Sequence, residues 1–230
     1  MKIITNDKLV KRYRTFGNIS LIVSLVVIGV GFYFLVKENS LLWGAVTMSV
    51  SFILSQVGIF FGNRFGVHPQ LHEQVSQELK GLDNHFQLFH YNTSVPHLLV
   101  GPAGVWILVP VTVKGKISYD STKNRWHQKG VNLFVRLFMQ ESLGRPDLEA
   151  ASAIKDIEKE FIKVYKGQKA PQVNALIFFT NPKAEVSAAD SPIPAFPIRK
   201  MKDFIRQKTK ANPITEEQLT QLSAFLPQGD

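Results

Sequence analysis

The chain has 230 residues, of which 45% are hydrophobic, and it carries a formal net charge of +9 without any cysteine. Seven basic and two acidic residues lie within 1–69, so about half of the charge belongs to the N-terminal part and the rest of the chain is only mildly basic. This balance excludes a strongly basic nucleic-acid-binding domain. The absence of cysteine excludes a disulfide framework and fits a cytoplasmic domain.

Two uncharged stretches near the N-terminus predict a pair of transmembrane helices. Runs of 22 and 25 uncharged residues flank Lys37–Glu38. A helix needs about 20 mostly apolar residues to cross a hydrocarbon core of roughly 30 Å, so spans near 16–36 and 41–62 are each long enough. Because the link between them is very short, we expect an antiparallel hairpin, with residues 1–65 as the membrane anchor.

Basic residues around the spans predict their orientation. Four basic residues close to the first span precede it and one follows the second, whereas the link carries one charge of each sign. Positive residues favour the cytoplasmic side, so both termini of this integral membrane protein are predicted to be cytoplasmic. A cleaved signal peptide would have an apolar region of about 7–15 residues and a small-residue cleavage site, which this longer run lacks.

Polar residues within the spans include Asn18, Gln56 and several serines but no Asp, Glu, Lys, Arg or His. No proton relay or ion path is therefore predicted. Small residues let two helices approach closely, and Gln56 can form a hydrogen bond across them. The small residues expected at the contact are Gly29, Gly31, Gly44, Ser51 and Ser55.

Residues 66–230 are predicted to form one cytoplasmic domain of mixed α/β (α+β) class. Apolar residues recur at helical spacing over 69–82, and 86–90 alternates as a strand does. The run 104–113 is nearly continuous in apolar and β-branched residues, which is typical of a strand buried on both faces. The other expected elements are strands near 97–100, 117–120 and 172–180 and helices near 147–165, 199–208 and 215–226. Residues 131–143 also show helical spacing, which predicts core packing or, alternatively, an interfacial or partner-binding helix.

Three segments follow one another in this order of elements: FGVHPQLHEQVSQEL, HLLVGPAGVWILVPVTVKGKI and QVNALIFFTNP. Over about 66–210 they resemble the nuclease-related domain (NERD) family of the restriction-endonuclease-like superfamily. The frame around Gly101, Gly104 and Gly115 is similar to the turns of that family. The resemblance implies a restriction-endonuclease-like domain behind the membrane anchor.

The catalytic residues that the resemblance implies are mostly missing. The family has a glutamate on an early helix, an Asp-His pair and a Glu-x-Lys sequence, and this chain keeps the early glutamate as Glu73. Pro96 stands in place of the aspartate, and Val109 and Val111 stand in place of the glutamate and lysine. Magnesium-dependent cleavage needs carboxylate oxygens to hold the ion, and neither valine nor proline has one. The domain is therefore predicted to be a non-catalytic relative without a metal site or cofactor.

An active site would survive only if its residues had moved to neighbouring elements, with Mg²⁺ as the cofactor. The candidates are Glu73, Lys114 and Asp120, with Asp83 and Glu141 as further acids. No convincing pair of carboxylates can be built from them. His68 and His72 lie near Glu73 but lack the H-E-x-x-H order and a third zinc ligand.

Arg199, Lys202 and Arg206 are predicted to lie near one another on a helix. In a tethered domain they are candidates for binding anionic lipid headgroups or nucleic acid. The preferred interpretation is a solvated helix whose apolar side packs on the core.

The sequence thus predicts a membrane-anchored binding or scaffolding module at the cytoplasmic membrane face, and not an enzyme. The alternative is a membrane-tethered, metal-dependent nuclease, or a nucleic-acid-binding protein, with relocated active-site residues. A third interpretation is an accessory subunit of a larger membrane complex. The expected partners are the lipid bilayer and either other proteins or a second copy of the chain, with nucleic acid as the partner under the alternative.

Overall fold

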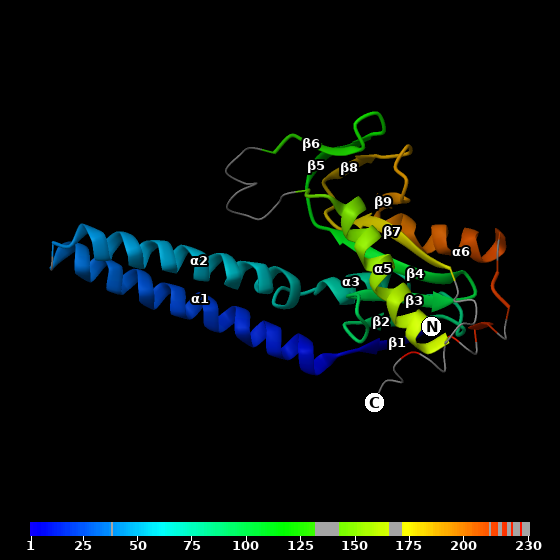
Figure 1. The fold of residues 1–230 in the computed structure, drawn as a ribbon, viewed down its shortest axis with the longest axis horizontal. Helices are drawn as coiled ribbons and strands as arrows, with labels where there is room; N and C mark the ends of the chain where they lie inside the picture. Colours follow the sequence, from blue (N-terminus) through cyan, green and yellow to red (C-terminus); the bar gives the residue numbers. More distant parts are fainter. Residues whose placement is uncertain are drawn as a thin grey trace. The chain divides into compact units, whose positions relative to one another are not determined.

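The computed structural model describes residues 1–37, 39–131, 143–165, 172–211, 213–215, 218–219, 222 and 226. These residues form two compact units (Figure 1). The helical pair consists of Asp7–Leu71. The α/β unit contains Met1–Asn6 together with the described residues from His72 onward.

The helical pair consists of two long apolar helices that pack side by side, α1 (Asp7–Val36) and α2 (Leu41–Phe65). Their mean hydropathy over the most apolar window is 2.7 and 1.7, and both are long and apolar enough to cross a membrane. The prediction of two apolar helices is confirmed. Helix α1 begins at Asp7 and not near 16, because the lysines and arginines before the apolar run are themselves good helix formers.

Small residues recur every seven positions along the contact between α1 and α2. Ser51 Oγ donates a hydrogen bond of 2.8 Å to the carbonyl of Ser24 on the other helix. A Cβ added to Gly58 would lie only 2.6 Å from Leu21. Small side chains therefore allow the two backbones to approach, as they do in many pairs of membrane helices. The buried small residues with this spacing are Gly17, Ser24 and Gly31 on α1 and Gly44, Ser51 and Gly58 on α2.

The predicted helix contact is partly correct. Gly31, Gly44 and Ser51 are buried there as expected. The prediction for Gly29 is wrong, because no atom lies within 4 Å of a Cβ added to it. Two residues correspond to a rotation of about 200° around a helix, so Gly29 and Gly31 point to opposite sides. Ser55 donates its hydroxyl to a carbonyl of its own helix and not to the partner helix.

The α/β unit is built on a mixed six-stranded sheet in the order β1-β2-β3-β4-β7-β9. Strand β3 runs antiparallel to both of its neighbours, and the other neighbouring pairs are parallel. The central strands β4 and β7 are almost completely buried, as their apolar sequences predict. The strands are β1 (Lys2–Thr5), β2 (Gln87–His90), β3 (His97–Gly101), β4 (Gly104–Val111), β7 (Val173–Phe179) and β9 (Ala195–Pro197).

A second, three-stranded mixed sheet has the order β6-β5-β8. Its strands are β5 (Gly115–Asp120), β6 (Arg125–Lys129) and β8 (Ala184–Ser187). Ile117 of β5 and Trp126 of β6 are buried in the same hydrophobic core as α5 (Pro146–Tyr165). The small sheet therefore extends the core on the α5 side of the main sheet.

The two faces of the main sheet are covered by different helices. In Figure 1, α5 crosses one face of the sheet, where Ile157 and Phe161 are buried against β4 and β7. On the other face, Phe204 of α6 (Met201–Ala211) packs 5.3 Å from the ring of Trp106. The short helix η1 (Ile198–Lys200) leads into α6, and α3 (Leu71–Glu78) supplies the buried Val75. The mixed α/β class is confirmed.

The compact units do not coincide with the predicted ranges 1–65 and 66–230. Lys2–Thr5 pairs in register with Gln87–His90, so the first residues belong to the sheet and not to the helical pair. Strands β6, β8 and β9 were also not predicted. The helix predicted at 131–143 lies almost entirely outside the described residues, as does most of the one predicted at 215–226.

Replacing Gly31 by alanine is expected to destabilise the helical pair by about 1–3 kcal/mol, the usual effect of overpacking a tight contact. The added Cβ would lie 2.5 Å from Thr47 Oγ1. The measurement is reversible unfolding of the full chain in detergent micelles, followed by circular dichroism. Gly29→Ala is the matched control and should be neutral or slightly stabilising, because its added Cβ meets open space and alanine is the better helix former. Equal destabilisation by both substitutions would contradict the close contact between Gly31 and α2.

Candidate functional site

The positions at which the NERD resemblance implies catalytic residues lie on opposite faces of the main sheet, because successive side chains of a strand point to opposite faces. Val109 and Val111 of β4 face the core on the α5 side of the sheet. Helix α3 lies on the opposite side, because its Ser76 bonds His90, whose neighbour Phe89 faces the α5 side. Glu73 is part of α3. The fold therefore does not bring Glu73 together with the two valine positions.

The surroundings of these positions are apolar on the α5 side. Val109 and Val111 are 3% and 7% exposed within a core of aliphatic and aromatic side chains. Pro96 is exposed just before β3, which begins at His97. A divalent cation requires oxygen ligands at such a site, and these side chains provide none.

The other candidate catalytic residues are spread over separate turns. The carboxylate of Asp120 accepts hydrogen bonds from the hydroxyl and backbone N–H of Thr122, and the hydroxyl bond in particular holds the pKa of Asp120 below its usual value. Asp83 pairs with His85, and the carbonyl of Lys114 accepts a hydrogen bond from a glutamine side chain. Glu141 lies outside the described residues. Within the part of the chain that the structure describes, no three His, Cys, Asp or Glu side chains come together as metal ligands.

The predicted basic residues have a structural role that the sequence did not indicate. Lys202 Nζ donates to the carbonyl of Lys80 at 3.3 Å, and Arg206 Nη2 donates to the carbonyl of Gly81 at 3.1 Å. These carbonyls follow directly after α3, where positive charge is favourable to a helix. Arg199 lies in η1, and the apolar side of α6 packs on the core as predicted.

A buried chain of hydrogen bonds links α3 to strands β2 and β3. Ser76 Oγ lies 2.9 Å from His90 Nε2, and His90 Nδ1 lies 2.8 Å from His97 Nδ1. Both histidines are completely buried. The ring of His72 lies 5.7 Å from that of His90, and the ring of Tyr91 lies 5.1 Å from that of His97.

Burial keeps the central histidine neutral. It lowers the pKa of His90 to about 3, and the neighbouring His72 contributes in the same direction. A neutral imidazole has one N–H, so the chain can run in either direction. Either Ser76 donates to His90 and His90 to His97, or His97 donates to His90 and His90 to Ser76.

Sequence reasoning missed this chain of hydrogen bonds because its members lie on three separate elements and become neighbours only through strand register. His90 and His97 form the last antiparallel pair of β2 and β3. The sequence places both within predicted strands, but only the pairing indicates that their rings face each other. Ser76 joins them because α3 covers the same face of the sheet.

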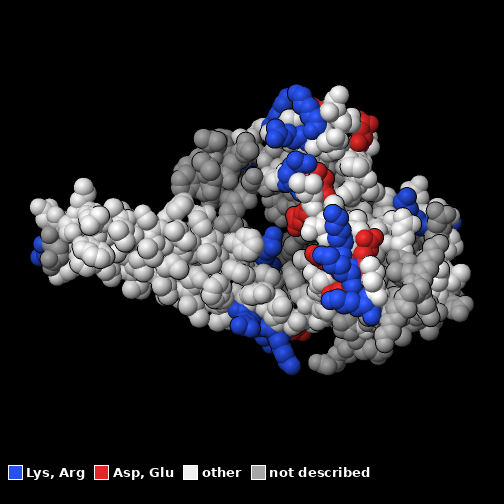
Figure 2. Space-filling model, viewed as in Figure 1, with Lys and Arg blue, Asp and Glu red and all other residues white. Residues whose placement is uncertain are grey.

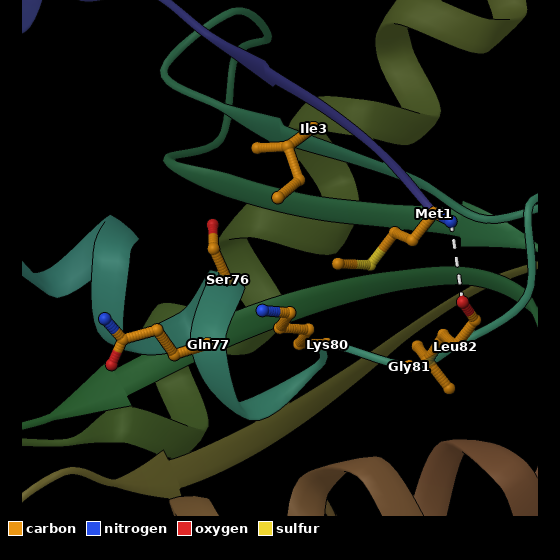
Figure 3. Close-up of a pocket in the computed structure, with 7 residues that line it drawn as sticks. All are labelled: Met1, Ile3, Ser76, Gln77, Lys80, Gly81 and Leu82. Atoms are coloured by element: carbon orange, nitrogen blue, oxygen red, sulfur yellow. Dashed lines mark hydrogen bonds between the residues drawn. The ribbon is translucent and has the colours of Figure 1, made fainter.

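A cavity of about 450 Å³ lies beside Ser76. It is bounded on one side by β1 and on the other by α3 and the turn that follows α3. Figure 3 shows the side chains of Met1 and Ile3 directed toward the same space as those of Ser76 and Lys80. The backbone of β1 is fixed there by hydrogen bonds from the Met1 nitrogen to Leu82 and Asn84. The cavity therefore exists only when β1 has joined the sheet.

On the face of the molecule seen in Figure 2, the surface charge is mixed. In the view of Figure 2, basic and acidic side chains alternate over α5, and basic ones gather over β5 and β6. In the same view the helical pair shows no charged side chains along most of its length. The α/β unit thus offers no single broad basic face in this view, in line with its modest net charge.

No known protein family, no curated protein and no solved structure matches this chain. The resemblance to the NERD family therefore stays a prediction that rests on three segments of the sequence.

Below pH 6.5 the free energy of unfolding is expected to fall by about 1.4 kcal/mol per pH unit on account of His90 alone. The unfolded chain binds a proton at an ordinary pKa of 6.5, whereas the folded chain binds one at His90 only near 3. Stability from this group is complete above pH 6.5 and is lost progressively down to pH 3. Unfolding at pH 7 and pH 5 measures the difference, which should shrink in His90→Asn. The exposed His85 gives the control His85→Asn, and an equal flattening of the pH dependence in that variant would contradict the assignment.

Proposed function

We propose that this chain is a membrane-anchored binding or scaffolding protein whose α/β unit, a non-catalytic relative of the NERD family, works at the cytoplasmic face of the membrane. The observation that carries the proposal is that both ends of the helical pair lead into one folded unit, since Asn6 and His72 both belong to the α/β unit. A transmembrane hairpin fits this arrangement, because its two ends emerge on the same side of the membrane.

The surface of the helical pair supports insertion into a bilayer. Leu25, Val36 and Leu41 are 70%, 75% and 78% exposed, and many other large apolar side chains along both helices are exposed as well. Such a surface is unfavourable in water but is the expected one in lipid, where apolar side chains meet acyl chains. At about 1.5 Å per residue, each helix is also longer than the roughly 30 Å hydrocarbon core.

The charges at the ends of the helices support the cytoplasmic placement. Lys8, Lys11, Arg12 and Arg14 lie in the first turns of α1, and Arg64 lies in the last turn of α2. Arg64 stacks over the ring of Phe60, which places its cation at the end of the apolar surface. Basic residues next to a span favour the cytoplasmic side.

A non-catalytic role is supported by the positions that the resemblance assigns to catalysis. Val109 and Val111 are core residues, and Glu73 lies on the other side of the sheet. A nuclease of this kind needs several oxygen ligands on one metal ion. We infer that the domain keeps the frame of the family for binding and not for cleavage.

Purified full-length chain is expected to show no metal-dependent cleavage of labelled single-stranded or double-stranded DNA or RNA. The assay compares Mg²⁺, Mn²⁺ and EDTA. Glu73→Ala should behave as the natural chain does, because the described residues hold no group of three side chains that could ligate a metal ion.

Other outcomes of this assay would indicate a different function. Metal-dependent cleavage that disappears in Glu73→Ala or Lys114→Ala would overturn the proposal in favour of a tethered nuclease with relocated residues. Binding without cleavage that weakens steeply with salt would identify nucleic acid as the partner of the module, because phosphate contacts release counterions. Stable co-purification with other membrane proteins would instead identify an accessory subunit.

The orientation is expected to appear in cysteine labelling, for which the natural chain is an ideal background because it has no cysteine. In intact cells an impermeant maleimide should label Ser40→Cys, in the link between the helices, but not Ser121→Cys, in the exposed turn after β5. Cell lysis should make Ser121→Cys reactive. A permeant maleimide serves as the control for accessibility of both sites, and the reverse pattern in intact cells would contradict the proposed topology.

A further inference from the structure

The cavity between β1 and α3 has the size and lining of a site for a small molecule. Its volume of about 450 Å³ falls within the range of roughly 300–1,000 Å³ that is usual for ligand sites. Met1, Ile3 and Leu82 supply an apolar wall, and Gln77 extends away from the space in Figure 3. The wall is therefore suited to an apolar ligand body and not to a fully polar metabolite.

Positive charge is concentrated at one side of this cavity. Among the described residues that line it, Lys80 has the only charged side chain. Lys202 and Arg206 bond the carbonyls of Lys80 and Gly81, so two further cations lie beside the same turn. This arrangement complements a negatively charged group on the ligand.

Ser76 adds a hydroxyl group to the cavity, and this hydroxyl can either donate a hydrogen bond to His90 or accept one from it. When His97 donates to His90 and His90 Nε2–H donates to Ser76 Oγ, the serine hydroxyl is released to donate into the cavity. Ser76 precedes Lys80 by four residues, and Figure 3 shows both side chains directed toward the cavity. A carboxylate placed between them would accept one hydrogen bond from the ammonium and one from the hydroxyl.

We propose that this cavity binds a small amphiphilic anion of the single-chain fatty-acid type. Its carboxylate contacts Lys80 Nζ and Ser76 Oγ, and its alkyl chain lies against Met1, Ile3 and Leu82. Binding selects the tautomer of His90 that carries its proton on Nε2. Binding at this cavity requires neither a NERD-type fold nor any interaction with nucleic acid.

The experiment uses the full chain in nanodiscs of zwitterionic lipid, because detergents would compete as amphiphiles. A medium-chain fatty acid with a diazirine in its alkyl chain is added and photolysed, and labelled peptides are mapped by mass spectrometry. Labelling is expected in the peptides that contain Met1–Ile3 and Ser76–Leu82. Unlabelled fatty acid should compete for this labelling and its methyl ester should not, since the ester lacks the charge.

Two variants test the polar contacts. Lys80→Glu should weaken labelling at this site at least about tenfold, as expected for loss of a charge-assisted hydrogen bond. Lys155→Glu, the same charge change at an exposed position of α5, should leave it unchanged. Ser76→Ala removes the hydroxyl without adding charge and should also weaken labelling. The ¹⁵N resonances of His90 should report Nε2 protonation when the fatty acid is bound.

Three results would overturn the proposal. The first is labelling confined to α1 and α2, which would mean that the probe only dissolves in the bilayer. The second is equal loss of labelling in Lys80→Glu and Lys155→Glu, and the third is equal competition by the acid and its methyl ester. None of these results bears on cleavage of nucleic acid, so failure here is distinguishable from failure of the proposed function.

Discussion

The parallel pairing of β1 with β2 is the interaction on which the rest of the molecule depends. Four residues, Lys2–Thr5, pair in register with Gln87–His90. The whole helical pair lies between these two strands in the sequence. Through this pairing the segments before and after the apolar helices belong to one folded unit, and the chain continues directly from the strand into α1. The same pairing fixes Met1 and Ile3 over α3, which creates the cavity. A short edge strand thus connects membrane topology with the cavity beside α3.

The division of the sheet into two faces explains why similar residues have different roles. On the α5 face the side chains are apolar and interlock with the small sheet, so this face stabilises the unit by burial alone. On the α3 face, polar groups are buried and must therefore be hydrogen-bonded to one another. Ser76 and both ring nitrogens of His90 satisfy this requirement, and His97 does so through its Nδ1. The chemistry available to the α/β unit therefore lies on the α3 face, away from Val109 and Val111.

Some of these features can be predicted from the sequence because they require a particular pattern of apolar residues within one segment. Long apolar runs predict α1 and α2, and β4 and β7 were predicted because a strand buried on both faces must be apolar throughout. Strand β1 leaves no such pattern, since four residues are too few to show a period and its partner is distant. The serine–histidine chain depends on strand register, which no local pattern contains. The face on which Glu73 lies could likewise be known only once the sheet was assembled.

The position of β1 has a consequence for the order in which the chain assembles. Its partner β2 follows both helices, so β1 cannot pair until the helices have been synthesised. Closing so long a loop would carry an entropic penalty, but an antiparallel pair of helices returns the chain close to its starting point and removes much of it. Until then the edge of β2 is open, and open strand edges recruit strands from other chains. Correct pairing of the apolar helices therefore also protects the sheet against strand exchange and aggregation.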